Sequence, residues 1–160
     1  MSAARIGIAI VVVAASTAFA QVRRPIPSFE TQVVSEHITP GSSAHLRLKV
    51  ALPAGLHVQS DKPRDPSLIA TALTLTAPTG VSIDRTTYPK ATDLPQPGRD
   101  EPLAVFSGTF TIDVDVAIAS SVRPGTLNIP ATLRYQSCTD EVCFPPTRTA
   151  VTWRLAVSAR

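Results

Sequence analysis

The sequence has only two cysteines and seven glycines, and beyond its first twenty residues it has no long hydrophobic run. A membrane-spanning helix needs roughly 20 consecutive apolar residues, and no later segment approaches that length. The 15 basic side chains are scattered along the chain rather than gathered in one run. Nucleic-acid binding would need a concentrated basic patch. We therefore expect neither a membrane span in the mature chain nor nucleic acid as a partner.

The first twenty residues have the pattern of a cleavable signal peptide. Arg5 supplies a positive charge, residues 6–18 are mostly apolar, and Ala18-Phe19-Ala20 forms a small-x-small cleavage site. The mature chain is then expected to begin at Gln21 and to be exported to an oxidising compartment, most simply the bacterial periplasm. Residues 21–27 would be an N-terminal extension, and residues 28–160 would form one domain.

Proline is abundant, with 15 residues, whereas glycine is scarce. Because proline interrupts helices and removes backbone donors, it favours short strands joined by stiff loops. Apolar residues alternate with polar ones in several segments, which predicts half-buried strands. These segments are residues 31–38, 46–52, 70–76, 81–87, 110–116, 126–135 and 149–157. Seven or eight strands without a convincing helix predict an all-β, immunoglobulin-like antiparallel β-sandwich.

The segment from Tyr88 to Pro102 interrupts this alternation. It carries prolines at positions 89, 95, 97 and 102. Loops of this length are often lids, binding loops or flexible segments, although a solvated connection is an equally simple interpretation. The sequence therefore predicts a long proline-rich surface loop.

The two cysteines, Cys138 and Cys143, are separated by four residues. A disulfide closing such a small ring would add only about 2 kcal/mol to the stability of the folded protein. Stabilisation alone is therefore a weak reason for this pair. Thiol–disulfide exchange, in contrast, needs two sulfurs within reach of each other. Asp140 and Glu141 lie between the cysteines, and their negative charge should raise the thiol pKa. The pattern favours a redox pair whose reactivity depends on contact with a partner.

Other candidate residues have simpler interpretations. His57 either tunes the redox site or is structural. A metal site built from His37, His45, His57 and the cysteines would lack recognisable ligand spacing, so neither a metal nor a cofactor is expected. Tyr135 should pack in the core with its hydroxyl near the cysteine loop. No serine–histidine–acid order or phosphate-binding loop is recognisable.

Several separated motifs resemble a known family. They are Gly55-Leu56-His57-Val58-Gln59-Ser60-Asp61-Lys62-Pro63, Tyr88-Pro89, Val105-Phe106-Ser107-Gly108, Tyr135-Gln136-x-Cys138 and Cys143-Phe144-Pro145-Pro146. Together they cover most of residues 28–157. They are similar to motifs of the N-terminal periplasmic domain of the thiol:disulfide interchange protein DsbD.

The resemblance implies an immunoglobulin-like sandwich that receives electrons from a membrane-embedded domain and passes them to oxidised periplasmic proteins. Cys143 would form the mixed disulfide with the partner, and Cys138 would resolve it. The family's loop over the cysteines can carry a shielding aromatic residue. In the matching segment here, about residues 89–102, Leu94 is the only large apolar candidate for that role.

Full-length members of the family continue into a membrane carrier and a thioredoxin-like domain, whereas this sequence ends shortly after its last predicted strand. We therefore expect a separate membrane electron donor and thioredoxin-like periplasmic partners for a protein-disulfide reductase relay. The residues expected to support or shield the pair are Tyr135, Asp140, Glu141, Phe144, Leu94 and His57. The alternative is a non-catalytic binding or assembly module in which the disulfide only stabilises a loop.

Overall fold

The computed structural model describes residues 26–98 and 100–159. The expected signal peptide and most of the expected extension lie outside these residues. Within them the regular elements are all strands, and no helix is long and apolar enough to cross a membrane. The strands are β1 Ser28–Val33, β2 Ser43–Ala51, β3 His57–Gln59, β4 Ala72–Leu75, β5 Val81–Thr87, β6 Thr92–Leu94, β7 Leu103–Ser107, β8 Thr109–Ile118, β9 Gly125–Tyr135, β10 Ser137–Cys138 and β11 Thr147–Val157.

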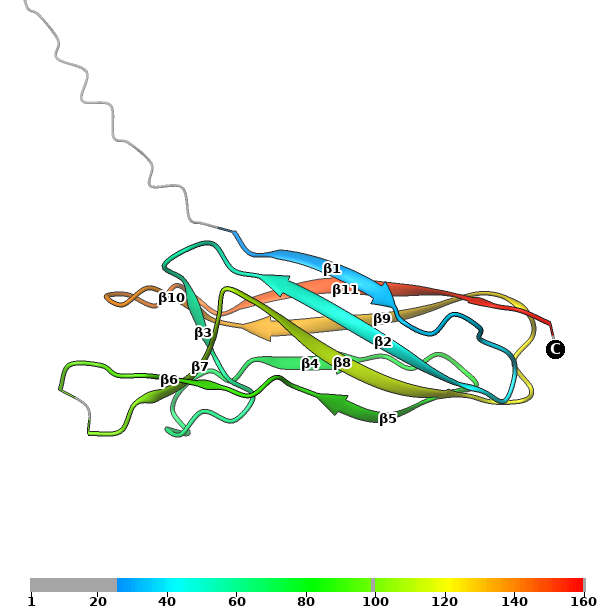
Figure 1. The fold of residues 1–160 in the computed structure, drawn as a ribbon, viewed down its shortest axis with the longest axis horizontal. Coiled ribbons are helices and arrows are strands. Elements are labelled where there is room, and N and C mark those ends of the chain that lie inside the picture. Colours follow the sequence, from blue (N-terminus) through cyan, green and yellow to red (C-terminus); the bar gives the residue numbers. More distant parts are fainter. Residues whose placement is uncertain (1–25, 99, 160) are drawn as a thin grey trace, which may run out of the picture.

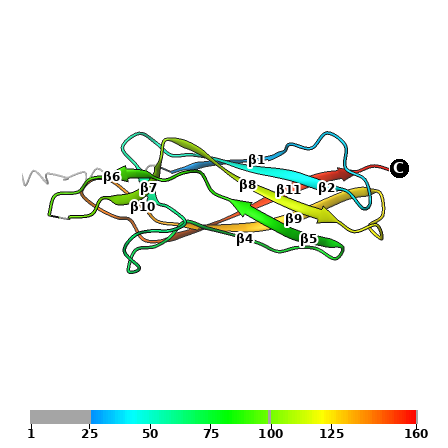
Figure 2. The ribbon, with the colours of Figure 1, turned by 60° about the horizontal axis from the view of Figure 1, so that its bottom comes forward.

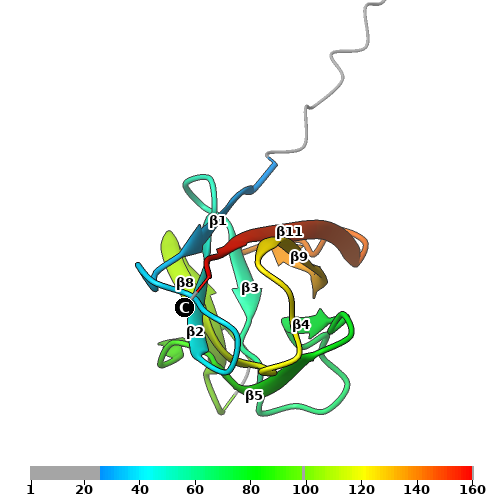
Figure 3. The same ribbon diagram turned by 90° about the vertical axis from the view of Figure 1, so that its right-hand side faces the viewer.

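The strands form three antiparallel sheets. One layer has the order β1-β2-β8-β5, and the facing layer has the order β11-β9-β4. Figure 3 shows these two layers on opposite sides of the core. A smaller sheet, with the order β10-β3-β7-β6, lies at the end of the molecule away from the C-terminus (Figures 1 and 2). The predicted immunoglobulin-like antiparallel β-sandwich is confirmed.

The core follows from the alternation that the sequence shows. In β2 and β8, apolar side chains at every second position are buried, and the register sets Leu46 opposite Val114 and Leu48 opposite Ile112. Trp153 of β11 is completely buried between the layers, and its Nε1 donates a hydrogen bond of 3.0 Å to the backbone oxygen of Arg47. That bond joins the two layers of the sandwich.

The strands that the sequence pattern missed are the short ones. β3, β6, β7 and β10 contain between two and five residues, too few for a clear period of two. β7 is also buried at four successive positions, so it shows no alternation. β1 ends at Val33 rather than at residue 38, and the predicted loop from Tyr88 contains β6, which pairs with β7. All four missed strands belong to the small end sheet, which carries the cysteines.

Gly108 allows the chain to pass from the end sheet into the main layer. It lies between β7 and β8 and has a φ of 60°. Residues other than glycine rarely adopt this backbone conformation. Its backbone oxygen accepts a hydrogen bond from the Leu52 amide, just after β2. This bend and the turn before β3 hold the end sheet against the sandwich.

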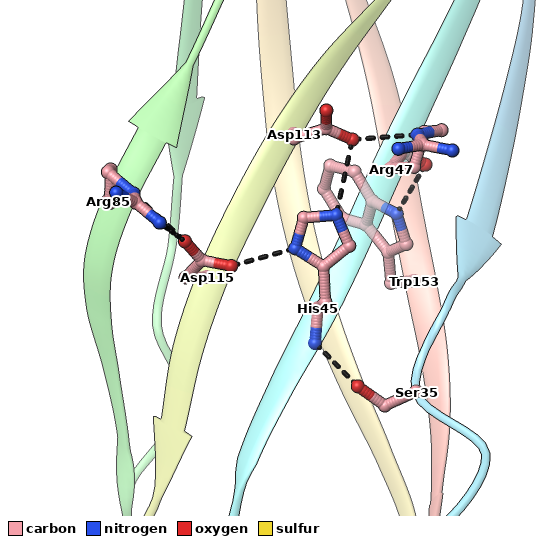
Figure 4. A network of polar contacts seen from close by, with 7 residues as sticks. All are labelled: Ser35, His45, Arg47, Arg85, Asp113, Asp115 and Trp153. Carbon is pink, nitrogen blue, oxygen red and sulfur yellow. Dashed lines mark hydrogen bonds and ion pairs between the residues drawn. The ribbon is translucent and has the colours of Figure 1, made fainter.

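A charged network crosses the exposed face of β2, β8 and β5 (Figure 4). His45 Nδ1 lies 2.7 Å from Asp115 Oδ1, and Arg85 reaches the other oxygen of Asp115 at 2.8 Å. Arg47 Nε lies 2.7 Å from Asp113 Oδ1. Hydrogen bonds, first from His45 and then from Arg85, lower the pKa of Asp115. The network therefore links three strands of one layer through two carboxylates.

We expect Asp115→Asn to lower the thermal midpoint slightly at neutral pH. A carboxyl whose pKa is lowered by folding contributes stability above its unfolded pKa, and that contribution is lost as the pH falls through the folded pKa. The deficit of the variant should therefore shrink as the pH falls below 3.8, the ordinary value for this side chain. Thermal melts followed by circular dichroism across this range measure the effect. Asp84→Asn, at an exposed position of neighbouring β5, is the matched control. An equal, pH-independent deficit in both variants would contradict the assignment.

Candidate redox site

The cysteines close a tight hairpin, here called the cysteine hairpin, which spans residues 137–144. Cys138 and Cys143 form a disulfide with a Cα–Cα distance of 4.0 Å and also a β-bridge. The Thr139 amide donates to the oxygen of Val142 at 2.8 Å, and the Phe144 amide donates to the oxygen of Ser137 at 2.9 Å. These backbone bonds close the hairpin in addition to the sulfur–sulfur bond.

The two sulfur-bearing residues differ in exposure. Cys138 is only 1% exposed, and it lies on β10 between β3 and the returning arm of the hairpin. Cys143 lies on that returning arm and is exposed. Val142 beside it is 54% exposed, which is unusual here for a large apolar residue. A protein partner can therefore reach Cys143, whereas Cys138 is covered.

Strand register places a row of four residues across one face of the end sheet. Cys143 is bridged to Cys138, Cys138 pairs with His57 of β3, and His57 pairs with Ser107 of β7. Directly opposed residues of antiparallel strands project from the same face. The structure therefore brings His57, which lies far away in the sequence, next to the buried cysteine.

His57 is only 4% exposed. Burial lowers the pKa of His57, and the carboxylate of Asp140 opposes this shift by raising it. Desolvation disfavours the charged imidazolium, so the ring is neutral near pH 7. Its Nε2 is buried and has no hydrogen-bond partner among the described residues. His57 is therefore a buried imidazole, paired in register with a cysteine of the disulfide.

The other predicted supporting residues surround the hairpin in different ways. Tyr135 is buried and packs against Phe29, with the ring centroids 5.6 Å apart. Phe144 is half-buried and packs against the core. Asp140 and Glu141 are both exposed at the tip of the hairpin. The two aromatic side chains therefore pack in or against the core near the ends of the hairpin, and its tip carries negative charge.

Leu94 lies on β6, at the edge of the end sheet opposite β10. β3 and β7 lie between β6 and β10, the strand that carries Cys138. Leu94 and Asp140 both line a cavity of about 480 Å³, whose other lining residues include His57 and Ser107. The shielding role expected for Leu94 stays a prediction.

The proline-rich segment is anchored rather than free. Arg64 donates a 2.6 Å hydrogen bond to the backbone oxygen of Pro102 and forms ion pairs with Asp93 and Glu101. β6 also pairs with β7. The cysteine hairpin and this β6–β7 hairpin project from the same end of the sandwich (Figure 1).

Comparison with known protein families finds one family that matches most of the chain. The family described as "Thiol:disulfide interchange protein DsbD, N-terminal" matches residues 24–154, which include both hairpins and the disulfide. The chain belongs to the DsbD N-terminal family. The match supports a thiol–disulfide interchange module, and the chain contains a disulfide-bonded cysteine pair. Among curated proteins, sequence comparison finds no match to this chain.

Comparison with solved structures finds two N-terminal domains that are similar to this chain. The N-terminal periplasmic domain of ScsB from Proteus mirabilis has a TM-score of 0.55 at 12% identity, covering 87% of this chain and 49% of that one. The N-terminal domain of DsbD from Neisseria meningitidis, in its reduced form, has a TM-score of 0.48 at 13% identity, covering 79% and 83%. The first of these likenesses supports the fold. The chain spans about half of the ScsB structure.

Several features of this DsbD N-terminal domain were not expected from its sequence. Gln59 and Ser137 are buried near the cysteines, and each has a side-chain oxygen without a hydrogen-bond partner in the described part of the chain. The polar residues His57 and Gln59 flank Val58 with a period of two, a weak signal that could have indicated a strand.

In the described residues, no group of three or more histidine, cysteine and acidic side chains is placed to hold a metal ion.

Proposed function

We propose that this protein is a periplasmic thiol–disulfide relay that passes two electrons from its dithiol form to an oxidised partner. The observation that carries the proposal is the unequal exposure of the two cysteines, exposed Cys143 and buried Cys138. A sulfur must be accessible to exchange with another protein. The exposed cysteine suits attack on a partner, and the buried cysteine suits the later resolving step.

The exchange proceeds in two steps. The Cys143 thiolate attacks one sulfur of the partner disulfide, which forms a mixed disulfide and releases the other partner sulfur as a thiolate. Cys138 then attacks the Cys143 sulfur, closes the intramolecular disulfide and releases the second partner thiolate. The released thiolates take protons from solvent. The partner gains two electrons, and the protein is left oxidised until a dithiol donor reverses the sequence.

The partners follow from the family and from the surface of the hairpin. We propose thioredoxin-like periplasmic proteins as electron acceptors and a separate membrane protein as the donor. Exposed Val142 beside Cys143 offers an apolar contact, and Asp140 and Glu141 add negative charge. A partner with an apolar rim and nearby basic groups around its active-site cysteine would complement this tip.

The double variant Cys138→Ser, Cys143→Ser distinguishes the proposed relay from a module whose disulfide is only structural. We expect it to remain folded and to lose about 2 kcal/mol of stability, because the six-residue ring restricts the unfolded chain only slightly and backbone bonds already close the hairpin. It should also lose all electron transfer to an oxidised thioredoxin-like protein. Urea unfolding and thiol alkylation followed by mass spectrometry measure the two effects.

The matched control is the unmodified protein, compared in its oxidised and reduced forms. The reduced form should transfer electrons and unfold within about 2 kcal/mol of the oxidised form. A double variant that is unfolded at room temperature would show that the disulfide is chiefly structural and would favour a binding or assembly module. A folded reduced protein that transfers no electrons to such a partner would contradict the relay.

A further inference from the structure

The Nε2 nitrogen of His57 is one of three buried side-chain atoms near the cysteines that have no hydrogen-bond partner in the described residues. Nε2 has lost its hydration through burial and has no hydrogen-bond partner in the described residues. Such atoms are rare in folded proteins because the lost hydration is not replaced. In the oxidised form nothing in the disulfide can donate a hydrogen to it. Reduction changes this, because it gives Cys138 an S–H group.

The strand register places that S–H group beside the histidine. Cys138 and His57 are directly paired across β10 and β3. Opposed residues of antiparallel strands have Cβ atoms about 4.5–5.5 Å apart on the same face, so a thiol and an imidazole at these positions can reach each other. Both residues are buried. The nitrogen that has no partner in the oxidised form can therefore accept a hydrogen bond in the reduced form.

We propose that His57 is the proton acceptor for Cys138 when that thiol resolves the mixed disulfide, an inference that rests on the relay proposed above. The Cys138 proton passes to His57 Nε2 as the Cys138 sulfur attacks the Cys143 sulfur. The bond between Cys143 and the partner breaks, and the electron pair leaves with the partner as a thiolate. The imidazolium then returns its proton to solvent, and the partner thiolate takes one up.

The electrostatics of the site suit this role. A buried thiol holds its proton because burial disfavours the thiolate, and water has little access to Cys138 at 1% exposure. A local base is therefore needed. The charged groups that line the adjoining cavity are Asp140, from the cysteine hairpin, and Asp93, from β6, while β7 contributes the neutral Ser107. The Asp140 carboxylate favours the imidazolium, so it would stabilise the transient charge.

The experiment separates the two exchange steps with dithiobis-nitrobenzoate, an aromatic disulfide that releases a coloured thiolate at each step. The first release reports attack by Cys143, and the second reports resolution by Cys138. We expect His57→Gln to slow the second release at pH 7 by about 10²-fold, the usual contribution of a positioned base, and to leave the first unchanged. Glutamine keeps a hydrogen-bonding amide but cannot take up a proton. His37→Gln, at an exposed histidine, should change neither release.

The pH profile provides a second readout that a packing role would not alter. In the unmodified protein the second rate should level off above the pKa of His57, whereas in His57→Gln it should keep rising with pH as hydroxide replaces the lost base. Wild-type rates for both releases in His57→Gln would overturn the assignment while leaving the relay intact. Absence of the first release in the unmodified protein would instead overturn the relay itself.

A measurement on the unmodified protein keeps the proposal testable if the variant does not fold. The ¹⁵N resonance of His57 Nε2 should shift between the oxidised and reduced forms, because only the reduced form offers an S–H donor. The resonances of His37 should not shift. An unchanged His57 resonance in the two forms would overturn the proposal.

Discussion

Replacing Cys138 with alanine should leave this protein covalently bound to a thioredoxin-like partner, whereas replacing Cys143 should prevent any such complex. The expected asymmetry follows from exposure, because Cys143 is exposed and Cys138 is buried. Without Cys138, the mixed disulfide forms at Cys143 and has no internal thiol to resolve it. Non-reducing electrophoresis should show the complex in nearly all of the Cys138→Ala protein when the partner keeps only its attacked cysteine, activated as a mixed disulfide with nitrothiobenzoate, because a second partner thiol would reverse the step.

The matched control for this trapping experiment is the double Cys→Ser variant, which should give no complex. The Cys143→Ala variant should react more slowly with alkylating reagents than Cys138→Ala, because its remaining thiol is buried. Equal trapping by both single variants, or trapping through Cys138 alone, would show that the roles of the two sulfurs are assigned wrongly even if the exchange itself occurs.

Trp153→Ala should be the most destabilising single change in the sandwich. The side chain is completely buried between the layers, and its indole donates a hydrogen bond to the backbone oxygen of Arg47. Truncating a buried tryptophan leaves a cavity and typically costs about 3–5 kcal/mol, a large fraction of the roughly 5–15 kcal/mol that stabilises a domain. The chain has a single tryptophan, so urea unfolding should be followed by far-ultraviolet circular dichroism rather than by fluorescence.

Two controls bracket the effect of Trp153→Ala. Trp153→Phe retains most of the apolar volume but removes the indole donor, so it should be less destabilising than the alanine variant. Val142→Ala, at the exposed tip of the cysteine hairpin, should change the free energy of unfolding by less than about 0.5 kcal/mol. A loss below about 1 kcal/mol in Trp153→Ala would show that the two layers do not depend on this contact.

The long strands were predictable because their local pattern and their tertiary role agree. Leu46, Leu48, Ile112 and Val114 alternate with polar residues in the sequence, and all four are buried at paired positions of β2 and β8. The short strands of the end sheet were not predictable in this way. Their two to five residues carry too little alternation, and they persist because neighbouring strands satisfy their backbone groups.

The sequence alone determined the fold class, the family resemblance and the presence of a closely spaced cysteine pair. Each of these depends on residues that are near one another in the chain or on motifs that can be read in order. Only the tertiary structure decided that Cys138 is buried and Cys143 exposed, that Leu94 lies at the opposite edge of the sheet, and that His57 faces Cys138. Exposure and strand register depend on contacts between distant segments, because shifting a strand by one residue would turn the side chain of His57 to the other face of the sheet.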